Sequence, residues 1–261
     1  MRDDEADMAG SDDLLADIRD HVMTIRFNRP TKRNAITYAM YERIIDLIGR
    51  AERDDTVRCL LFAGSGPIFT AGHDVSGFAQ GLALAYDEKP SYIFMKRLAD
   101  FSKPVAAALN GDAVGIGATM LFHCDFVYAV PDCRLVFPFA DMGLIPEFAS
   151  SAYLPQLVGQ RRAMALLLKD RGCSAEEGIA LGIVNETVAA ENLAAHVANR
   201  LAGITALSPD AVAETKRLLK AGTREAIGIA IAEEARSFHD LLHSPFVRDR
   251  LAAIRQRISA G

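Results

Sequence analysis

Two glycine-bearing turns are the part of this sequence whose residue types and spacing can do chemistry. One runs from Phe69 to Asp74 and the other from Asn110 to Gly117, and each follows a segment that reads as a buried strand. Small residues let the main chain approach a ligand closely, and a helix that begins at Gly115 points free N–H groups outward. Two such turns can offer two N–H donors to one oxygen atom, an arrangement that stabilises a developing oxyanion. Glycines alone are equally typical of a helix packed tightly against a strand.

Several chemistries that depend on short motifs are excluded. A dinucleotide-binding fold needs a third small residue where Gly115-Ile116-Gly117 continues to Met120, and it carries its motif near the start of the domain. The sequence has no Gly-Lys-Ser or Gly-Lys-Thr phosphate loop, no Gly-x-Ser-x-Gly elbow and no His-Glu-x-x-His motif. We therefore expect neither a metal site nor a nucleotide redox cofactor.

The elements that must position these turns follow from the hydrophobic pattern. Residues from Leu14 predict a strand, 17–20 a turn and 22–27 a second strand, so a hairpin opens the domain. Thr37 is a good N-cap for a helix that runs to about Arg53. The spacing of strands and helices after it predicts parallel pairing. The further expected elements are strands at 57–63, 104–109, 125–130 and 134–137, and helices at 91–101, 115–122, 160–171, 175–181, 191–205, 208–220 and 223–242.

Composition indicates a globular protein with balanced charge. The chain has 261 residues, 50% of them apolar, and a net charge of −5. Residues 1–13 hold six acids and one base, so the other 28 acids and 28 bases cancel and predict no nucleic-acid or membrane partner. No apolar run approaches the ~18 residues of a membrane span, and four cysteines without Cys-x-x-Cys spacing fit a cytoplasmic protein. We expect an acidic, disordered tail at 1–13, a core at 14–205 and a helical C-terminal region at 206–261.

Four motifs, in order and at family spacing, resemble the crotonase (enoyl-CoA hydratase/isomerase) superfamily. They are Asn28 to Ala35, Phe69 to Asp74, Lys103 to Val105 with Asn110 to Gly117, and Cys124-Asp125. The resemblance covers about residues 14 to 200. It implies an α/β fold, a spiral of ββα units, with a helical C-terminal region that forms homotrimers or hexamers. It also implies an acyl-CoA thioester as ligand, with the backbone N–H groups of His73 and Ile116 as the oxyanion donors.

Hydratases of this superfamily use two glutamates, one to activate water and one to deliver a proton. The resemblance places those glutamates at Thr119 and Phe139 of this sequence. Neither residue transfers protons as a carboxylate does. The sequence therefore argues against ordinary hydratase activity.

One carboxylate, Glu147, stands in a segment that resembles the Pro-Glu-x-x-Ser-Ser motif of 3,2-enoyl-CoA isomerases, in which the glutamate is the catalytic base. Burial among apolar neighbours would raise the pKa of Glu147, whereas a helix N-terminus would lower it, and the sequence leaves that balance open. The alternative role is a first-turn acid that follows a proline at the helix start. Asp74 and Asp112 are rival acids, for which loop-capping and turn-forming roles are more typical.

For coenzyme A, the resemblance points to main-chain contacts along both sides of the first turn. The expected cradle consists of Arg33, Ala35, Ala71, Asp74, Val75 and Gly115.

Three hypotheses remain open. The leading one is an isomerase that shifts the double bond of an enoyl-CoA from the β,γ to the α,β position, with Glu147 shuttling the proton through a dienolate. The second is an enoyl-CoA hydratase or another acyl-CoA reaction that uses a different acid, and the third is a non-catalytic acyl-CoA binder.

Overall fold

The computed structural model describes residues 13–75 and 81–259, of which the last six by backbone alone, so most of the predicted acidic tail lies outside the described residues. A hairpin opens the fold, as predicted. Strands β1 (Leu14–Arg19) and β2 (Val22–Phe27) pair antiparallel. The predicted turn at 17–20 is wrong in position, because Asp17 pairs with Thr24 inside the hairpin. The turn needs only Asp20 and His21, which both have left-handed φ angles.

Parallel pairing continues the main sheet in the order β1-β2-β3-β4-β6-β9. A second sheet has the order β5-β7-β8, and its strand β5 lies within the second glycine-bearing turn. The expected α/β fold is confirmed, but β5, β8 and β9 were not predicted, because two or three residues are too few to show an alternating pattern. The strands of these sheets, besides the hairpin, are β3 (Cys59–Gly64), β4 (Val105–Leu109), β5 (Ala113–Val114), β6 (Phe126–Ala129), β7 (Arg134–Val136), β8 (Gly172–Ser174) and β9 (Glu186–Thr187).

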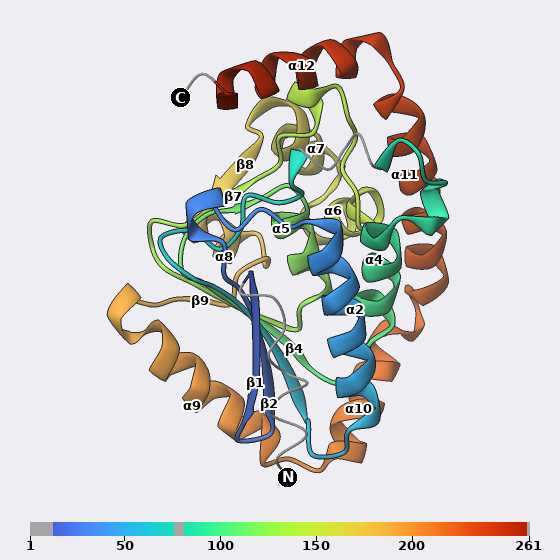
Figure 1. Cartoon of the computed structure of the whole chain (residues 1–261). Coiled ribbons are helices and arrows are strands. Elements are labelled where there is room, and N and C mark those ends of the chain that lie inside the picture. The colour runs from blue at the N-terminus through green and yellow to red at the C-terminus, as the bar shows by residue number, and fades with distance from the viewer. Residues whose placement is uncertain (1–12, 76–80, 260–261) are drawn as a thin grey trace.

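Helices cover the main sheet. Helix α2 (Tyr38–Arg53) begins where the sequence predicts, since the Thr37 side chain accepts a hydrogen bond from Met40 N. It lies side by side with α4 (Pro90–Asp100), and α11 packs against α4 on the same flank (Figure 1). The other helices are α5 (Ile116–Thr119), α6 (Ser150–Val158), α7 (Gln160–Met164), α8 (Ala175–Ala180), α9 (Leu193–Thr205), α10 (Pro209–Ala221), α11 (Arg224–Leu242) and α12 (Pro245–Ser259), with a π-helical turn at Ala165–Lys169. Short 3₁₀ turns lie at Pro30–Lys32, Tyr86–Glu88, Met120–His123, Ala140–Met142 and Ala190–Asn192.

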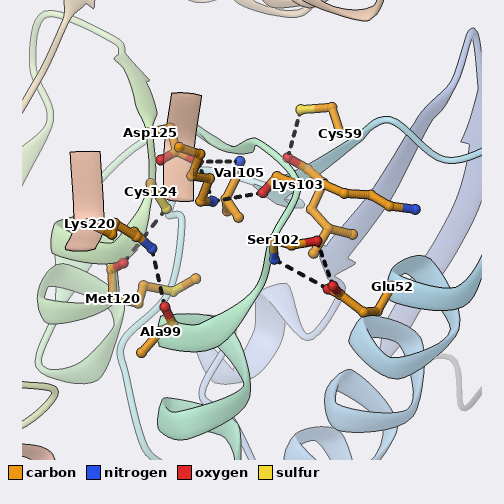
Figure 2. Close-up of polar contacts among 12 residues, drawn as sticks. Glu52, Cys59, Ala99, Ser102, Lys103, Val105, Met120, Cys124, Asp125 and Lys220 are labelled. Carbon is orange, nitrogen blue, oxygen red and sulfur yellow. Dashed lines mark hydrogen bonds and ion pairs between the residues drawn. The ribbon is translucent and has the colours of Figure 1, made fainter. Parts of the chain in front are cut away.

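A partly buried ion pair fastens α10 to the sheet. Lys216 Nζ lies 2.6 Å from Asp125 Oδ2, and the same oxygen accepts a hydrogen bond from Val105 N at 2.8 Å. Figure 2 shows Asp125 beside Val105, with Lys220 reaching toward the Ala99 carbonyl, 3.2 Å away. Helix α10 is therefore tied to the core by two lysine side chains. Within the described part of the chain, no helix is both long and apolar enough to cross a membrane.

Candidate active site

The two glycine-bearing turns lie side by side. Phe69 N and Thr70 N donate to the Asp112 carbonyl at 3.1 and 3.3 Å, and Val114 N donates to the Thr70 carbonyl at 3.0 Å. These bonds pair the turns in parallel. The side chain of Asp112 is engaged elsewhere, where it accepts from Arg134 N at 3.0 Å, so its role is structural.

Glycine is required where the turns touch. Gly72 has a φ of +83°, and a Cβ there would lie 2.5 Å from the Val114 carbonyl oxygen and 3.6 Å from Ile116 N. A Cβ on Gly117 would clash with the Thr70 side chain. A larger residue at either position would push the turns apart.

The two predicted N–H donors stand on these neighbouring segments. Ile36 N donates to the Gly72 carbonyl at 2.8 Å and Asp74 N donates to the Ile36 carbonyl at 2.9 Å. The main-chain N–H of His73, between them, therefore points away from Ile36. Ile116 is the first residue of α5, so its N–H has no carbonyl one turn earlier to bond.

Asn34 holds the first turn in place. Its side-chain Nδ2 donates to the carbonyls of Ser65, Ile68 and Phe69 at 2.9, 2.8 and 3.1 Å, while its Oδ1 accepts from Arg29 N at 2.8 Å. The residue is fully buried and has a φ of +55°. Asparagine suits this left-handed position, and its amide joins the chain before the turn to the chain that enters it.

The residues expected to cradle coenzyme A come together around one arginine. The Arg33 carbonyl accepts from Ala71 N at 2.8 Å, which joins the two sides of the cradle. Arg29 Nη1 donates to the Ala35 carbonyl at 2.6 Å and to Asp74 Oδ2 at 3.0 Å. The Asp74 side chain thus forms an ion pair with Arg29. The remaining members of the predicted cradle are Val75, which follows Asp74, and Gly115, which precedes α5.

Glu147 does not occupy the first turn of a helix. Helix α6 begins at Ser150, and the two residues between them, Phe148 and Ala149, both have left-handed φ angles, +66° and +57°. This irregular turn carries the Glu147 side chain into the protein, where the residue is 9% exposed. Burial, together with the nearby Glu234 charge, raises the pKa of Glu147 to about 8, although Lys89 acts in the opposite direction. Of the two effects that the sequence left open, burial wins.

Two distant side chains clamp the turn that carries Glu147. Glu234, from α11, accepts from Ala149 N at 2.7 Å and from Ser151 N at 2.8 Å, so it caps the N-terminus of α6. His123 Nε2 lies 2.8 Å from the Phe148 carbonyl and therefore carries the proton that it donates. The turn has strained backbone angles, and these three hydrogen bonds help to hold it, together with those from Ser150 N and Ser150 Oγ to the Glu147 carbonyl.

A small cavity of about 40 Å³ lies in front of Glu147, between α4 and α11. That volume is about the space of one water molecule. The residues that line the cavity include Glu147 and His73 but not Ile116, together with polar groups that the sequence analysis did not single out. Its lining consists of Tyr38, His73, Tyr86, Lys89, Ser91, Tyr92, Met95, Glu147, Ala235, Phe238 and Leu242.

The His73 imidazole packs inward between two tyrosines. Its ring stacks on Tyr41 at 5.6 Å between centroids and meets the edge of Tyr38 at 5.1 Å. Burial lowers the pKa of His73 to about 4, so the ring is neutral at pH 7. Burial and the Glu147 charge raise the pKa of Tyr38 to about 12, so this hydroxyl keeps its proton. Of these three side chains, Glu147 has the pKa nearest to neutral pH.

A larger cavity, of about 630 Å³, lies at the other end of α4, against α10 and α11. It contains none of the predicted site residues, and charges along it form pairs, with Arg217 2.6 Å from Glu214 and Arg224 3.0 Å from Asp100. Among the residues whose placement is described, no three His, Cys, Asp or Glu side chains gather to hold a metal ion.

The sequence is similar to that of known proteins of one family. Residues 17–253 match the family described as "Enoyl-CoA hydratase/isomerase". The chain is 34% identical over 218 residues to "Enoyl-CoA delta isomerase 2" of Rattus norvegicus, a match that covers 82% of this chain and 56% of that protein. It is 35% identical over 201 residues to "1,2-epoxyphenylacetyl-CoA isomerase" of Escherichia coli, covering 72% of this chain and 76% of that protein.

Solved structures show the same architecture. The structure of OdaA from Pseudomonas aeruginosa superposes with a TM-score of 0.90 and 37% identity, over 94% of this chain and 99% of that one. An enoyl-CoA hydratase/isomerase from Pseudoalteromonas atlantica superposes with a TM-score of 0.86 and 31% identity, over 94% and 97% of the two chains. The chain spans little more than half the length of the rat relative that it matches.

Proposed function

Since the chain belongs to the enoyl-CoA hydratase/isomerase family of the crotonase superfamily, we propose that it is an enoyl-CoA isomerase that moves a double bond from the β,γ to the α,β position. The observation that carries this proposal is the buried carboxylate of Glu147, the one acid among the described residues that line the cavity containing His73. A double-bond shift needs one group that removes a proton and returns it elsewhere, and one carboxylate is sufficient for both steps.

The proposed reaction uses two parts of the site. The thioester oxygen accepts hydrogen bonds from the N–H groups of His73 and Ile116, which stabilise the negative charge when the α proton leaves. Glu147 takes that proton and forms a dienolate, then delivers the proton to the γ carbon. The substrate's electrons shift from the β,γ to the α,β bond, and the carboxylate is regenerated. No metal or redox cofactor takes part in this proposal.

The residues that stand where hydratases have their two glutamates support an isomerase over a hydratase. Thr119 and Phe139 are both buried, and neither supplies a carboxylate. A hydratase needs a second proton-transfer group to work with water, and among the described residues the other acid in contact with this turn, Glu234, has both oxygens engaged by α6.

The C-terminal helices are proposed to form the contacts of a homotrimer, or of a hexamer built from two trimers. The family resemblance implies this assembly. Helix α10 and the residues before it expose large apolar side chains, with Leu207 55%, Leu218 58% and Leu219 79% exposed, which suits a surface that another subunit covers.

Product analysis with two substrates tests the proposed reaction. The protein is incubated separately with a 3-enoyl-CoA and with the matching 2-enoyl-CoA, and the isomer and any 3-hydroxyacyl-CoA are separated by chromatography. Isomerisation without hydration supports the proposal. Rapid formation of the 3-hydroxy product would establish a hydratase, and tight binding without turnover would establish a binder.

The rate should depend on pH through Glu147. A base must be ionised before it takes a proton, and Glu147 holds its proton up to a pKa of about 8. We expect kcat/KM to rise by roughly tenfold per pH unit between pH 5 and 7 and to level off above about pH 8 to 9. Initial rates measured across this range check the expectation. A profile that is flat between pH 5 and 8 would contradict it.

Glu234 should affect the midpoint of the pH dependence of kcat/KM. In Glu234→Gln the charge that helps to raise the pKa of Glu147 is removed, so the midpoint of kcat/KM should move to lower pH by about one unit. Glu233→Gln, an exposed neighbour, serves as the matched control and should leave the midpoint in place. If Glu234 had only a structural role, the variant would lose rate at every pH with the same midpoint.

A further inference from the structure

The larger cavity beside α4 has room for a small organic molecule. Its volume of about 630 Å³ falls within the roughly 300 to 1,000 Å³ that is typical of ligand pockets. The cavity in front of Glu147, in contrast, measures about 40 Å³. The larger cavity lies between the C-terminal half of α4 and the residues of α10 and α11 that face it, and its lining includes none of the residues placed in the proposed active site.

One lysine in the wall of this cavity has an ammonium group that the protein satisfies only in part. Lys220, near the C-terminus of α10, is half-buried, and its Nζ donates to the Ala99 carbonyl at 3.2 Å (Figure 2). Burial and the nearby Lys216 charge lower the pKa of Lys220 to about 8, which leaves it charged at pH 7. Among the described residues, no carboxylate lies within ion-pair distance of its Nζ. An ammonium has three N–H donors, so two are available to a ligand.

The acids on and beside the cavity wall are mostly bound to other groups. The pairs are Lys216–Asp125 at 2.6 Å, Arg224–Asp100 at 3.0 Å and Arg217–Glu214 at 2.6 Å, and Glu52 accepts from Ser102 N at 3.3 Å. The remaining lysine of the wall, Lys96, is exposed and lies over the Tyr92 ring, 5.8 Å from its centroid. Lys220 is therefore the sheltered cation of this wall that lacks a carboxylate.

The cavity wall also offers apolar surface. Phe101, Ile227 and Ile231 line it, and Gly228 places no side chain in the space between the helices. A ligand with a carbon chain can remove this surface from water, and an anionic oxygen on the same ligand can accept the hydrogen bonds that Lys220 has left to donate. A single ammonium matches a single negative charge, whereas a doubly charged phosphate ester would be repelled by the acids nearby.

We propose that this cavity is a second binding site, which takes a free carboxylic acid with an unbranched apolar chain of medium length. The carboxylate pairs with Lys220 Nζ, and the chain lies against Phe101, Ile227 and Ile231. A carboxylic acid of this class is ionised at pH 7 and carries one charge. The site is distinct from the cavity of Glu147, so the inference does not depend on the proposed reaction.

Calorimetry with three small ligands tests the inference. Octanoate and octanamide have the same chain and differ in charge, whereas propanoate keeps the charge and lacks most of the chain. Octanoyl-CoA is present at saturating concentration throughout, so that the proposed active site is occupied. The wild-type protein should bind one octanoate per chain, at least tenfold more tightly than octanamide or propanoate.

Variants of two lysines from the same cavity wall locate the carboxylate. In Lys220→Met the ratio of octanoate to octanamide affinity should fall to about one, and Lys220→Arg should restore the preference, because a guanidinium also donates to a carboxylate. Lys96→Met removes an exposed positive charge from the same wall and is the matched control, which should keep the preference.

Equal binding of octanoate and octanamide to the wild-type protein would overturn the inference without any variant. Octanoate binding that octanoyl-CoA abolishes would assign the ligand to the active site, and a preference that survives in Lys220→Met or disappears in Lys96→Met would assign the carboxylate to another group. Each of these results overturns the proposal. A protein that binds octanoate as expected but moves no double bond in the product assay would refute the proposed reaction and leave this site standing.

Discussion

Replacing Glu147 by glutamine should lower the isomerisation rate by about 10³-fold, within the 10²- to 10⁴-fold range that a positioned acid or base contributes. Glutamine keeps the size and most of the polarity of the side chain but cannot take a proton. The buried site should accept it easily, since Glu147 with its pKa near 8 is already mostly uncharged at pH 7. Initial rates with a 3-enoyl-CoA, at saturating concentration, measure the effect.

The loss should appear in kcat and leave ligand binding close to that of the parent protein, because the proposed thioester contacts come from main-chain groups of other residues. Glu176→Gln, an isosteric change on the exposed face of α8, is the matched control and should retain full activity. A Glu147→Gln protein with undiminished isomerisation would show that another group moves the proton.

Replacing Asn34 by alanine should cost about 3 to 5 kcal/mol of unfolding free energy. The change removes the amide that bonds three carbonyls and the oxygen that receives Arg29 N, and it leaves these buried groups without their partner. Alanine also tolerates the left-handed φ of +55° less well than asparagine does. Urea unfolding followed by circular dichroism reads the difference.

The matched control is Asn192→Ala, since this asparagine is exposed and its side chain makes no capping hydrogen bond to the helix that follows it. Its effect should stay within about 0.5 kcal/mol. Similar stability for both variants would mean that the amide of Asn34 contributes no more than a surface group, contrary to the geometry of the first turn.

Local patterns in the sequence predicted the elements that depend on near neighbours. The helix after Thr37 is an example, because an N-cap and an apolar face both lie within its own residues. The paired glycine turns were also predictable, since Gly72, Gly111 and Gly117 mark places where the main chain must approach another segment. The strands β8 and β9 were missed because they are held by pairing partners far along the chain.

The surroundings of Glu147 could not be predicted from local patterns either, because the residues that contact its turn lie far along the chain. Neither the turn at Phe148 and Ala149 nor its clamp by Glu234 shows any periodicity, and Glu234 reads as one charge among several on a long helix. A buried Lys89 reads equally as a surface charge just before a helix-starting proline. Only the folded chain reveals that these residues meet. The one available signal is an acid, such as Glu234, at a position of a helix whose neighbours on the same face are apolar.

The contact between Glu234 and the turn of Glu147 has a consequence for how the protein is made. The carboxylate that caps α6 is 85 residues later in the chain than the amide of Ala149 that it holds. A ribosome therefore adds Glu147 to the chain well before it synthesises the helix that holds its turn. A chain that ended before α11 would contain Glu147 but lack the carboxylate that caps its turn.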